Sequence, residues 1–421
     1  MTAEIAIMNR DAVTLATDSA VTLTVRGTEK IYNSADKLFE LSDMDPMGIM
    51  IYNNLEYMGI SLEVAIKQFR LKRIHFNSVA EAADEFFNYL LEELAPDESL
   101  QRQHATELIY KDFLAIRMQF DRQLSLKVNP SLLLSQTIQQ AISEAESASI
   151  ATCFSETPEG AILEFYSRTF DTLIGEVFEG MPLDEEHRIL LKRMGALLLH
   201  RDRISDSFTG LVFAGFGQSE IFPSLVAYKT DGVILGKIKK SETDRETTSR
   251  NRVTGKILPF AQREMVDRFL YGIDPEFERA IEDYIRIAVE YSNGEITDAL
   301  PRCRSKGARE KFQKLISRAA SAAATKWRER IAPLYKGHFM HDVQNVLLLM
   351  PKRELASLAQ ELINLTSVKR KFSSGAESVG GPIDVAIISR IDGFVWVYRK
   401  HYFEPSLNPR YFHRKFDTKH A

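Results

Sequence analysis

The chain has 421 residues, of which 44% are hydrophobic and 27% are charged, a composition typical of a globular protein with one large domain or two ordinary ones. Its formal net charge of -4 gives no electrostatic case for binding nucleic acid or an anionic membrane, so we expect neither as a partner. The two cysteines, Cys153 and Cys303, lie far apart and form no motif with histidine. That spacing argues against a disulfide framework or a zinc site, and we expect no metal and no cofactor.

The absence of a secretory signal and of a long apolar run indicates the cellular compartment. The first residues of the chain have neither the basic nor the apolar region of a secretory signal. The longest apolar runs, such as 346–350, are too short to span a bilayer. We therefore expect a soluble, cytoplasmic protein without a membrane partner.

The first 52 residues have the period-two alternation and the β-branched content of strands, separated by polar turns at 9–11 and 26–27. The predicted strands are 3–8, 12–17, 21–25 and 48–52. The chain therefore begins directly in a sheet.

The apolar spacing then changes to three and four residues, which predicts a helix over 55–73. A second helix over 78–94 begins at a capping-box pattern formed by Ser78 and Glu81. Helical periodicity continues through 95–206, for example at 108–124, 132–148 and 162–178, with no catalytic constellation. We interpret this region as a helical insertion.

Strand character returns at 210–217, and an Asp231-Gly232 pair predicts a hairpin turn between strands 225–228 and 233–235. A further short strand is predicted at 257–260. The helices that follow are predicted at 262–271, 275–292, 307–329 and 351–369.

Near the C-terminus, a loop of small residues over 373–381 leads into strand 383–388. The pair Asp392-Gly393 then turns the chain into a last strand, 394–398. The tail over 401–421 is basic and aromatic, and we interpret it as a surface or subunit-contact tail. Strands at both ends and in the middle, with helix pairs between them, favour an α+β fold with helices covering a two-sheet core.

Two distant segments together resemble proteasome β-type subunits. In those subunits a leading Thr is followed by motifs matched here by 16–18, 21–22 and 37–39. The late segment 380–394 is similar to the family's Gly-Gly pair, Ile-Asp-Val strand and Asp-Gly hairpin. The chain also looks like bacterial proteasome relatives whose translation product starts Met-Thr. The resemblance implies the four-layer αββα sandwich of N-terminal-nucleophile (Ntn) hydrolases.

The resemblance also implies a division of the chain into core and inserted parts. The proteasome-like core would comprise three parts, and the rest would be two helical insertions and a tail. The core parts are 1–95, 207–290 and 350–400; the insertions are 96–206 and 291–349; and the tail is 401–421.

By the same resemblance, Thr2 would be the nucleophile once Met1 is removed, with Lys37 beside it and Asp18 orienting Lys37. Threonine is a weak nucleophile and needs a base. The α-amino group of an N-terminal Thr can serve, because its pKa of about 7.7–8.0 lies close to working pH.

The remaining site residues are assigned by the resemblance as well. The backbone N–H of Asn53 would form the oxyanion hole, at a position where the family usually has glycine. Glu377 and Ser378 are nearest in type to the residues that support the threonine amine. The positions matching the peptide-binding strand and the first specificity pocket are Val21, Thr22, Ala35, Ile51 and Leu55. Their character favours an apolar substrate side chain.

Three hypotheses remain open at this point. The first is a threonine peptidase or amidase that hydrolyses peptides or unfolded proteins within a self-assembled, homo-oligomeric complex. The second is a catalytically silent proteasome-like scaffold that keeps Met1. The third is an amidohydrolase acting on a small amide. The chain has no Walker-type loop, so a separate ATP-dependent unfoldase or adaptor would be the partner for any ATP-driven step.

Overall fold

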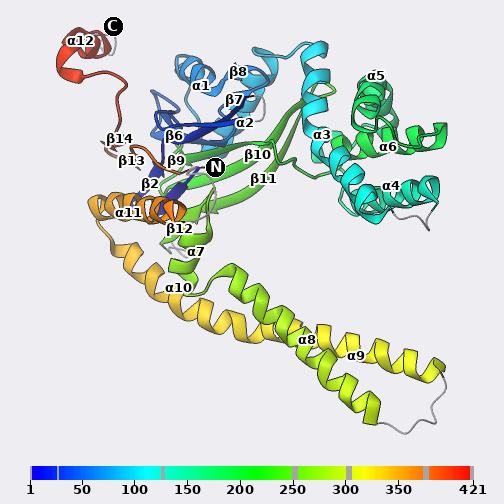
Figure 1. Ribbon diagram of the computed structural model, residues 1–421. Helices are drawn as coiled ribbons and strands as arrows, with labels where there is room; N and C mark the ends of the chain where they lie inside the picture. Colours follow the sequence, from blue (N-terminus) through cyan, green and yellow to red (C-terminus); the bar gives the residue numbers. More distant parts are fainter. Residues whose placement is uncertain are drawn as a thin grey trace.

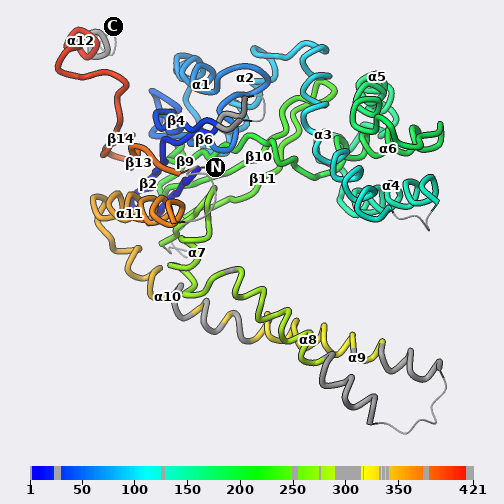
Figure 2. Tube along the Cα trace, in the orientation of Figure 1, coloured from blue at the N-terminus to red at the C-terminus, as the bar shows by residue number. Residues whose placement is uncertain are grey.

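Two antiparallel five-stranded sheets form the centre of the protein, as seen in a computed structural model that describes residues 2–25, 28–124, 129–248, 255–299, 306–372 and 379–417. The first sheet has the order β12-β1-β2-β13-β14. Its strands are β1 Glu4–Met8, β2 Ala12–Thr17, β12 Lys256–Pro259, β13 Asp384–Ser389 and β14 Gly393–Tyr398. The N-terminal strand thus pairs with β12, whose sequence lies about 250 residues further along the chain, and both figures place it inside the body (Figures 1 and 2).

The second sheet has the order β11-β10-β9-β6-β5. Its strands are β5 Leu38–Glu40, β6 Met47–Asn53, β9 Thr209–Gly215, β10 Ser224–Ile234 and β11 Lys237–Thr247. Two small hairpins complete the strands: β3 Val21–Val25 with β4 Thr28–Tyr32, and β7 Glu56–Tyr57 with β8 Ile60–Ser61.

Alternation along the strands explains how the two sheets are packed. On β1, Ala6 and Met8 join a buried cluster that also contains Met50 of β6 and Val212 of β9, so this face of each sheet meets the other. The intervening residues of β1, such as Ile5, pack instead against helices. Period-two patterning therefore places every β1 side chain in a buried layer.

Helices cover the outer faces of both sheets. The helices α1 Leu62–Arg70 and α2 Val79–Glu92 share a buried cluster with the second sheet. The helices α7 Glu264–Tyr271 and α11 Lys352–Lys371 share one with the first sheet. The structure is thus a mixture of helices and antiparallel sheets, as Figure 1 shows.

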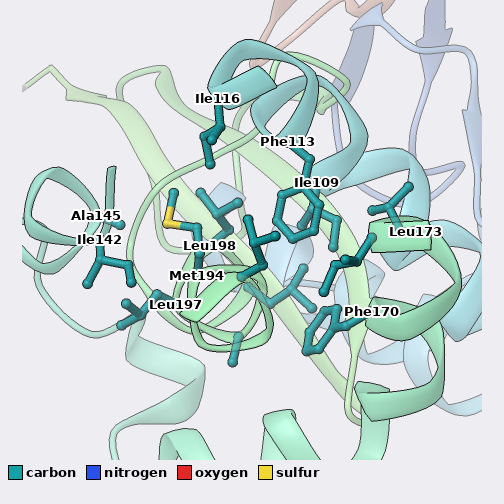
Figure 3. Close-up of a cluster of buried hydrophobic side chains, with 14 of the residues drawn as sticks. Ile109, Phe113, Ile116, Ile142, Ala145, Phe170, Leu173, Met194, Leu197 and Leu198 are labelled. Atoms are coloured by element: carbon teal, nitrogen blue, oxygen red, sulfur yellow. The ribbon is translucent and has the colours of Figure 1, made fainter. Parts of the chain in front are cut away.

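A separate helical block comprises α3 Glu98–Gln123, α4 Pro130–Glu146, the short 3-10 turn Thr152–Phe154, α5 Glu159–Val177 and α6 Glu185–His200. These helices bury their own apolar cluster, in which Phe113 of α3, Ile142 of α4 and Phe170 of α5 meet residues of α6 (Figure 3). The block thus has a hydrophobic core of its own, which contacts the sheets mainly through β10 and β11.

A long helical arm extends away from the sheets (Figure 1). It contains α8 Pro275–Ala299, α9 Lys306–Lys326, a π-helical turn Trp327–Ile331 and α10 Ala332–Leu349. Its two sides are linked by an ion pair between Glu282 and Arg328. After β14 the chain ends in the 3-10 turn Pro405–Leu407 and α12 Pro409–Asp417, which stands apart from the sheets (Figure 2). None of the helices in the described ranges is both long and apolar enough to cross a membrane.

Two predictions of local structure are wrong. The helix predicted over 55–73 is shorter, because the β7–β8 hairpin occupies its first turns, with Met58 and Gly59 at positive φ angles of 49° and 78°. The hairpin predicted at Asp231-Gly232 instead lies within the continuous strand β10, where the register shifts. The turn comes at Leu235 and Gly236, whose φ angles are both positive, as a two-residue hairpin requires.

Candidate functional site

Asp18 is the residue around which the candidate site is built. It follows β2 directly, and its side chain is completely buried. One carboxylate oxygen, Oδ1, accepts hydrogen bonds from Lys37 Nζ at 2.7 Å and from the backbone N–H of Ala3 at 3.1 Å. The other, Oδ2, accepts from the N–H groups of Gly380 at 3.0 Å and Ala20 at 3.3 Å. The carboxylate is therefore fully hydrogen-bonded and joins the N-terminal strand to a segment near the C-terminus.

Lys37 lies immediately before β5 and is also completely buried. Its ammonium group contacts Asp18 and donates to the carbonyl of Ala20 at 2.5 Å. Its carbonyl accepts from the N–H of Ile51, which anchors it to β6. A lysine is rarely buried without such partners, because taking the charge out of water is costly unless it is paired.

Thr2 is joined to this ion pair through the peptide bond that follows it, whose N–H contacts Asp18. It is 6% exposed, and its carbonyl accepts a hydrogen bond from the N–H of Gln262 at 3.1 Å. The N–H of the Thr2–Ala3 peptide bond is the group that contacts Asp18 Oδ1. Asp18 thus holds both the backbone that carries Thr2 and the ammonium group of Lys37, which brings the three predicted residues into one buried region.

A third charged residue of this region was not identified from the sequence. Glu4, on β1, is 1% exposed, and neither carboxylate oxygen has a hydrogen-bond partner in the described part of the chain. Burial raises the pKa of Glu4 well above its usual value; Lys37 opposes that increase and Asp18 adds to it. The available signal was a single charged residue in the otherwise apolar strand 3–8.

A pocket of about 400 Å³ lies next to the segment that leads into Lys37. Three of the five residues predicted to bind substrate line it, namely Ala35, Ile51 and Leu55. The charged and aromatic part of the lining comes from 61–67 and from the C-terminal segment 399–411. Such a pocket, half apolar and half polar, is large enough for one or two amino-acid side chains.

The other two predicted binding residues, Val21 and Thr22, begin β3, outside the lining of this pocket. Asn53 ends β6 with a positive φ of 68°, and its side-chain amide donates to the carbonyls of Asp206 and Phe208 at 3.0 and 2.8 Å. Its side chain therefore secures the loop before β9, which the sequence did not indicate.

Glu377 and Ser378 lie outside the described residues. The neighbouring Gly380 and Pro382 do contact the site region: Gly380 binds Asp18, and the Pro382 carbonyl accepts from Ser19 Oγ at 2.6 Å. Gly381 has a φ of 79°, and a side chain there would press against the backbone of Asn33. These contacts explain why small residues occupy this segment.

A second, partly buried ion cluster borders the pocket. Lys400 contacts both Asp384, at the start of β13, and Asp36, next to Lys37. In the register of the first sheet, Asp384 is opposite Thr17, which is opposite Glu4, so a row of polar residues crosses three strands. The sequence did not indicate this cluster, since Asp36 lies more than 300 residues from Asp384 and Lys400.

No protein-family model matches the chain, and no curated protein matches it in sequence. Among solved structures it is similar to Anbu from Hyphomicrobium sp. strain MC1, a Gly-1 mutant, at 11% identity and a TM-score of 0.28, covering 95% of this chain and 86% of that one. It is also similar to Anbu, an ancestral beta-subunit, from Yersinia bercovieri, at 9% identity and a TM-score of 0.27, covering 100% and 97%. At this level of similarity, chemistry has to be argued from the chain's own residues.

Proposed function

We propose that the protein is a threonine-type Ntn hydrolase that cleaves peptide bonds, with Thr2 as the nucleophile once the Met1–Thr2 bond has been cut. The observation that carries the proposal is the buried Lys37–Asp18 pair, whose Oδ1 also binds the peptide N–H that follows Thr2. A buried, paired cation next to a strand-terminal threonine has the arrangement that an activated hydroxyl needs.

The proposed reaction uses the chain's own groups. Thr2 Oγ attacks the substrate carbonyl, its proton passes to the α-amino group of Thr2, and a tetrahedral oxyanion forms. The ammonium group of Lys37 stabilises the developing charge on Oγ, while Asp18 holds Lys37 in place. The C–N bond then breaks, and the amine product leaves with the proton. Water hydrolyses the remaining ester and regenerates Thr2.

Substrate binding is proposed from three features. The N–H of Asn53 would stabilise the oxyanion, and Glu377 and Ser378 would support the amine. An extended peptide would pair with β3, at Val21 and Thr22, because β3 is the edge of a two-stranded sheet in the described chain. The pocket at Ala35, Ile51 and Leu55 would accept an apolar side chain.

The proposal extends to the architecture. The packing of helices on the outer faces of two facing sheets supports a four-layer αββα sandwich, and α3–α6 support the first insertion. The arm supports a second insertion, but it begins at Pro275, within the part 207–290 that was assigned to the core. We place the protein in the cytoplasm as a homo-oligomer that receives peptides or unfolded chains, with any unfoldase or adaptor as a separate partner.

Thr2→Ala tests the proposal. The intact mass of the wild-type protein should lack Met1, and the variant should keep its fold and assembly while losing all hydrolysis of a peptide panel. Thr14→Val is the control, since Thr14 is a buried threonine of β2 whose hydroxyl has no hydrogen-bond partner in the described part of the chain. Retention of Met1 would support the scaffold instead, and unchanged hydrolysis in Thr2→Ala would show that Thr2 is not the nucleophile. Hydrolysis of small amides but not peptides would favour the amidohydrolase.

A further inference from the structure

Glu4 is the buried ionisable group near the site that the proposed reaction leaves without a role. Neither of its carboxylate oxygens has a hydrogen-bond partner in the described chain, although it is 1% exposed. Leaving a buried polar group unpaired costs free energy, and the cost is larger when the group is charged. Native proteins keep few such groups, and those they keep often serve a function.

The strand geometry directs Glu4 toward the candidate nucleophile. Thr2 lies two residues before Glu4, the first residue of β1, and the backbone pairing continues to it, because the carbonyls of Glu4 and Thr2 accept from the N–H groups of Phe260 and Gln262 in turn. In such an extended segment the side chains of Thr2 and Glu4 project on the same face, about 6.5 Å apart along the chain. That face also carries Ala6 and looks toward the second sheet. Opposite Glu4 on β2 is Thr17, which is buried and whose hydroxyl is likewise unpaired. The region around Thr2 thus contains unused hydrogen-bond acceptors in a dry environment.

Cleavage of the Met1–Thr2 bond creates the donor that these acceptors lack. With Met1 attached, the nitrogen of Thr2 is an amide with one N–H. After cleavage it is an amine with two hydrogens, or an ammonium with three. The new group lies on the same strand as Glu4 and needs partners that orient it toward the Thr2 hydroxyl.

We propose that Glu4 is a positioning residue of the threonine site, whose carboxyl binds the α-amino group freed at Thr2 and holds it beside the hydroxyl it serves. This inference rests on the proposed function. Glu4 of β1 would thus support the threonine amine, the role that the resemblance assigns to Glu377 and Ser378.

The pH dependence follows from the groups that face Glu4. These are Lys37 before β5, Asp18 after β2 and Tyr52 on β6, whose own pKa is raised by burial and then by Glu4. An ammonium group next to Glu4 favours the ionised carboxylate, and the carboxylate in turn raises the pKa of the amine, so that the two titrate as a coupled pair. The base must be neutral, so activity rises with pH as this pair loses its proton.

The test uses the full-length protein and its variants Glu4→Gln and Glu4→Leu, with Thr14→Val as the control. The pKa of the Thr2 amine is read from the pH dependence of its acetylation by acetic anhydride, measured by mass spectrometry. Without the carboxylate, this pKa should fall by about one unit in both Glu4 variants. The apparent pKa of the acid limb in the pH profile of kcat/KM should fall by the same amount. The value of kcat should fall by about tenfold at most. Thr14→Val should match the wild type.

The outcomes separate this inference from the proposed function. An amine pKa that is the same in the wild type and both Glu4 variants overturns the positioning role, even if Thr2 is the nucleophile. A processed wild type that does not hydrolyse peptides overturns the proposed function, while the amine pKa still decides the role of Glu4. Retention of Met1 overturns both. If Glu4→Gln does not fold, the amine pKa of Glu4→Leu decides, because leucine is an apolar side chain suited to this buried position.

Discussion

Asp18 joins parts of the protein that lie far apart in sequence. Its carboxylate binds the backbone of β1, the ammonium group of Lys37 and the N–H of Gly380, which is 362 positions away. A single side chain therefore has both a structural and a proposed catalytic role. Substitution of Asp18 should therefore affect both the stability of the protein and its activity, which are measured separately.

Asp18→Asn should destabilise the protein strongly. The change keeps the shape of the side chain but leaves the ammonium group of Lys37 buried without its counter-charge, which costs about 3–5 kcal/mol. Urea unfolding monitored by circular dichroism measures the loss. The control is Asp11→Asn, because Asp11 is exposed and its contact with Arg10 is a surface ion pair worth at most about 1 kcal/mol. Equal stability of both variants would contradict a charged Lys37–Asp18 pair.

At the scale of elements, β10 depends on a glycine bulge. Gly232 has a φ of 80°, and an added Cβ would lie 2.7 Å from Met58 Sδ and 3.1 Å from His104 Nε2. Gly236, in the turn that follows, has a similar φ of 69° but open space around it. The two positions therefore separate backbone strain from crowding.

Gly232→Ala should cost more free energy of unfolding than Gly236→Ala. Both substitutions put alanine at a positive φ, which costs about 1 kcal/mol, and only Gly232→Ala adds the clash. We expect a difference of about 1–3 kcal/mol, measured by urea unfolding of the two variants under the same conditions. The same loss in both would show that Met58 and His104 move aside freely.

The contact between α7 and α11 should depend on pH. Hydrogen bonding to Lys369 of α11 lowers the pKa of Glu264 on α7 below its usual 4.5. Partial burial opposes this decrease, and charge attraction to Lys369 adds to it. Since the folded pKa is depressed, this stabilisation is present above pH 4.5 and is lost as pH falls through the folded pKa.

Glu264→Gln should therefore lower stability near pH 7 and have little effect near pH 3. Because the pair is partly exposed, the expected loss is at most about 1 kcal/mol. Urea unfolding at both pH values, in a double-mutant cycle with Lys369→Met, isolates the pair. A loss that persists unchanged at pH 3 would point to packing instead of charge.

Across the whole molecule, a buried ion pair within the second sheet is joined to the helical block by a hydrogen bond. Lys239 of β11 is 1% exposed; its Nζ lies 3.3 Å from Asp231 Oδ2 and donates to the carbonyl of Leu198 in α6 at 3.0 Å. Ser205 donates to the same carboxylate through its hydroxyl, at 2.8 Å. Burial lowers the pKa of Lys239, and Asp231 opposes that decrease.

Lys239→Met should loosen this connection. It leaves Asp231 buried without its cation, at a cost of about 3–5 kcal/mol, and hydrogen exchange should rise first at the end of α6. The double variant Lys239→Met/Asp231→Leu should recover most of the stability, because the unpaired charge is gone. A double variant no more stable than the single one would mean that the cost comes from the lost Leu198 contact.

Local patterns predicted much of the secondary structure. The predicted strand 257–260 and the Asp392-Gly393 turn are confirmed, the turn with a φ of 76° at Gly393. Ser78 caps α2 as predicted, although Glu81 binds the N–H of Asn77 and not that of Ser78. Turn chemistry and apolar spacing act over a few residues, so they can be read directly from the chain.

Local sequence patterns predicted strands such as β1, β2 and β12 and the helix periodicity, and the resemblance supplied Thr2, Asp18 and Lys37 as candidates. The strand β11 was not predicted, and the bulge at Asp231-Gly232 and the unpartnered burial of Glu4 emerge only from the packed sheets. The bulge depends on residues that are far away in the sequence, and the state of Glu4 depends on complete desolvation. Neither can be read from a short stretch of the chain. Burial is a property of the whole packed core, which is why the charge of Glu4 became informative only once the sheets were assembled.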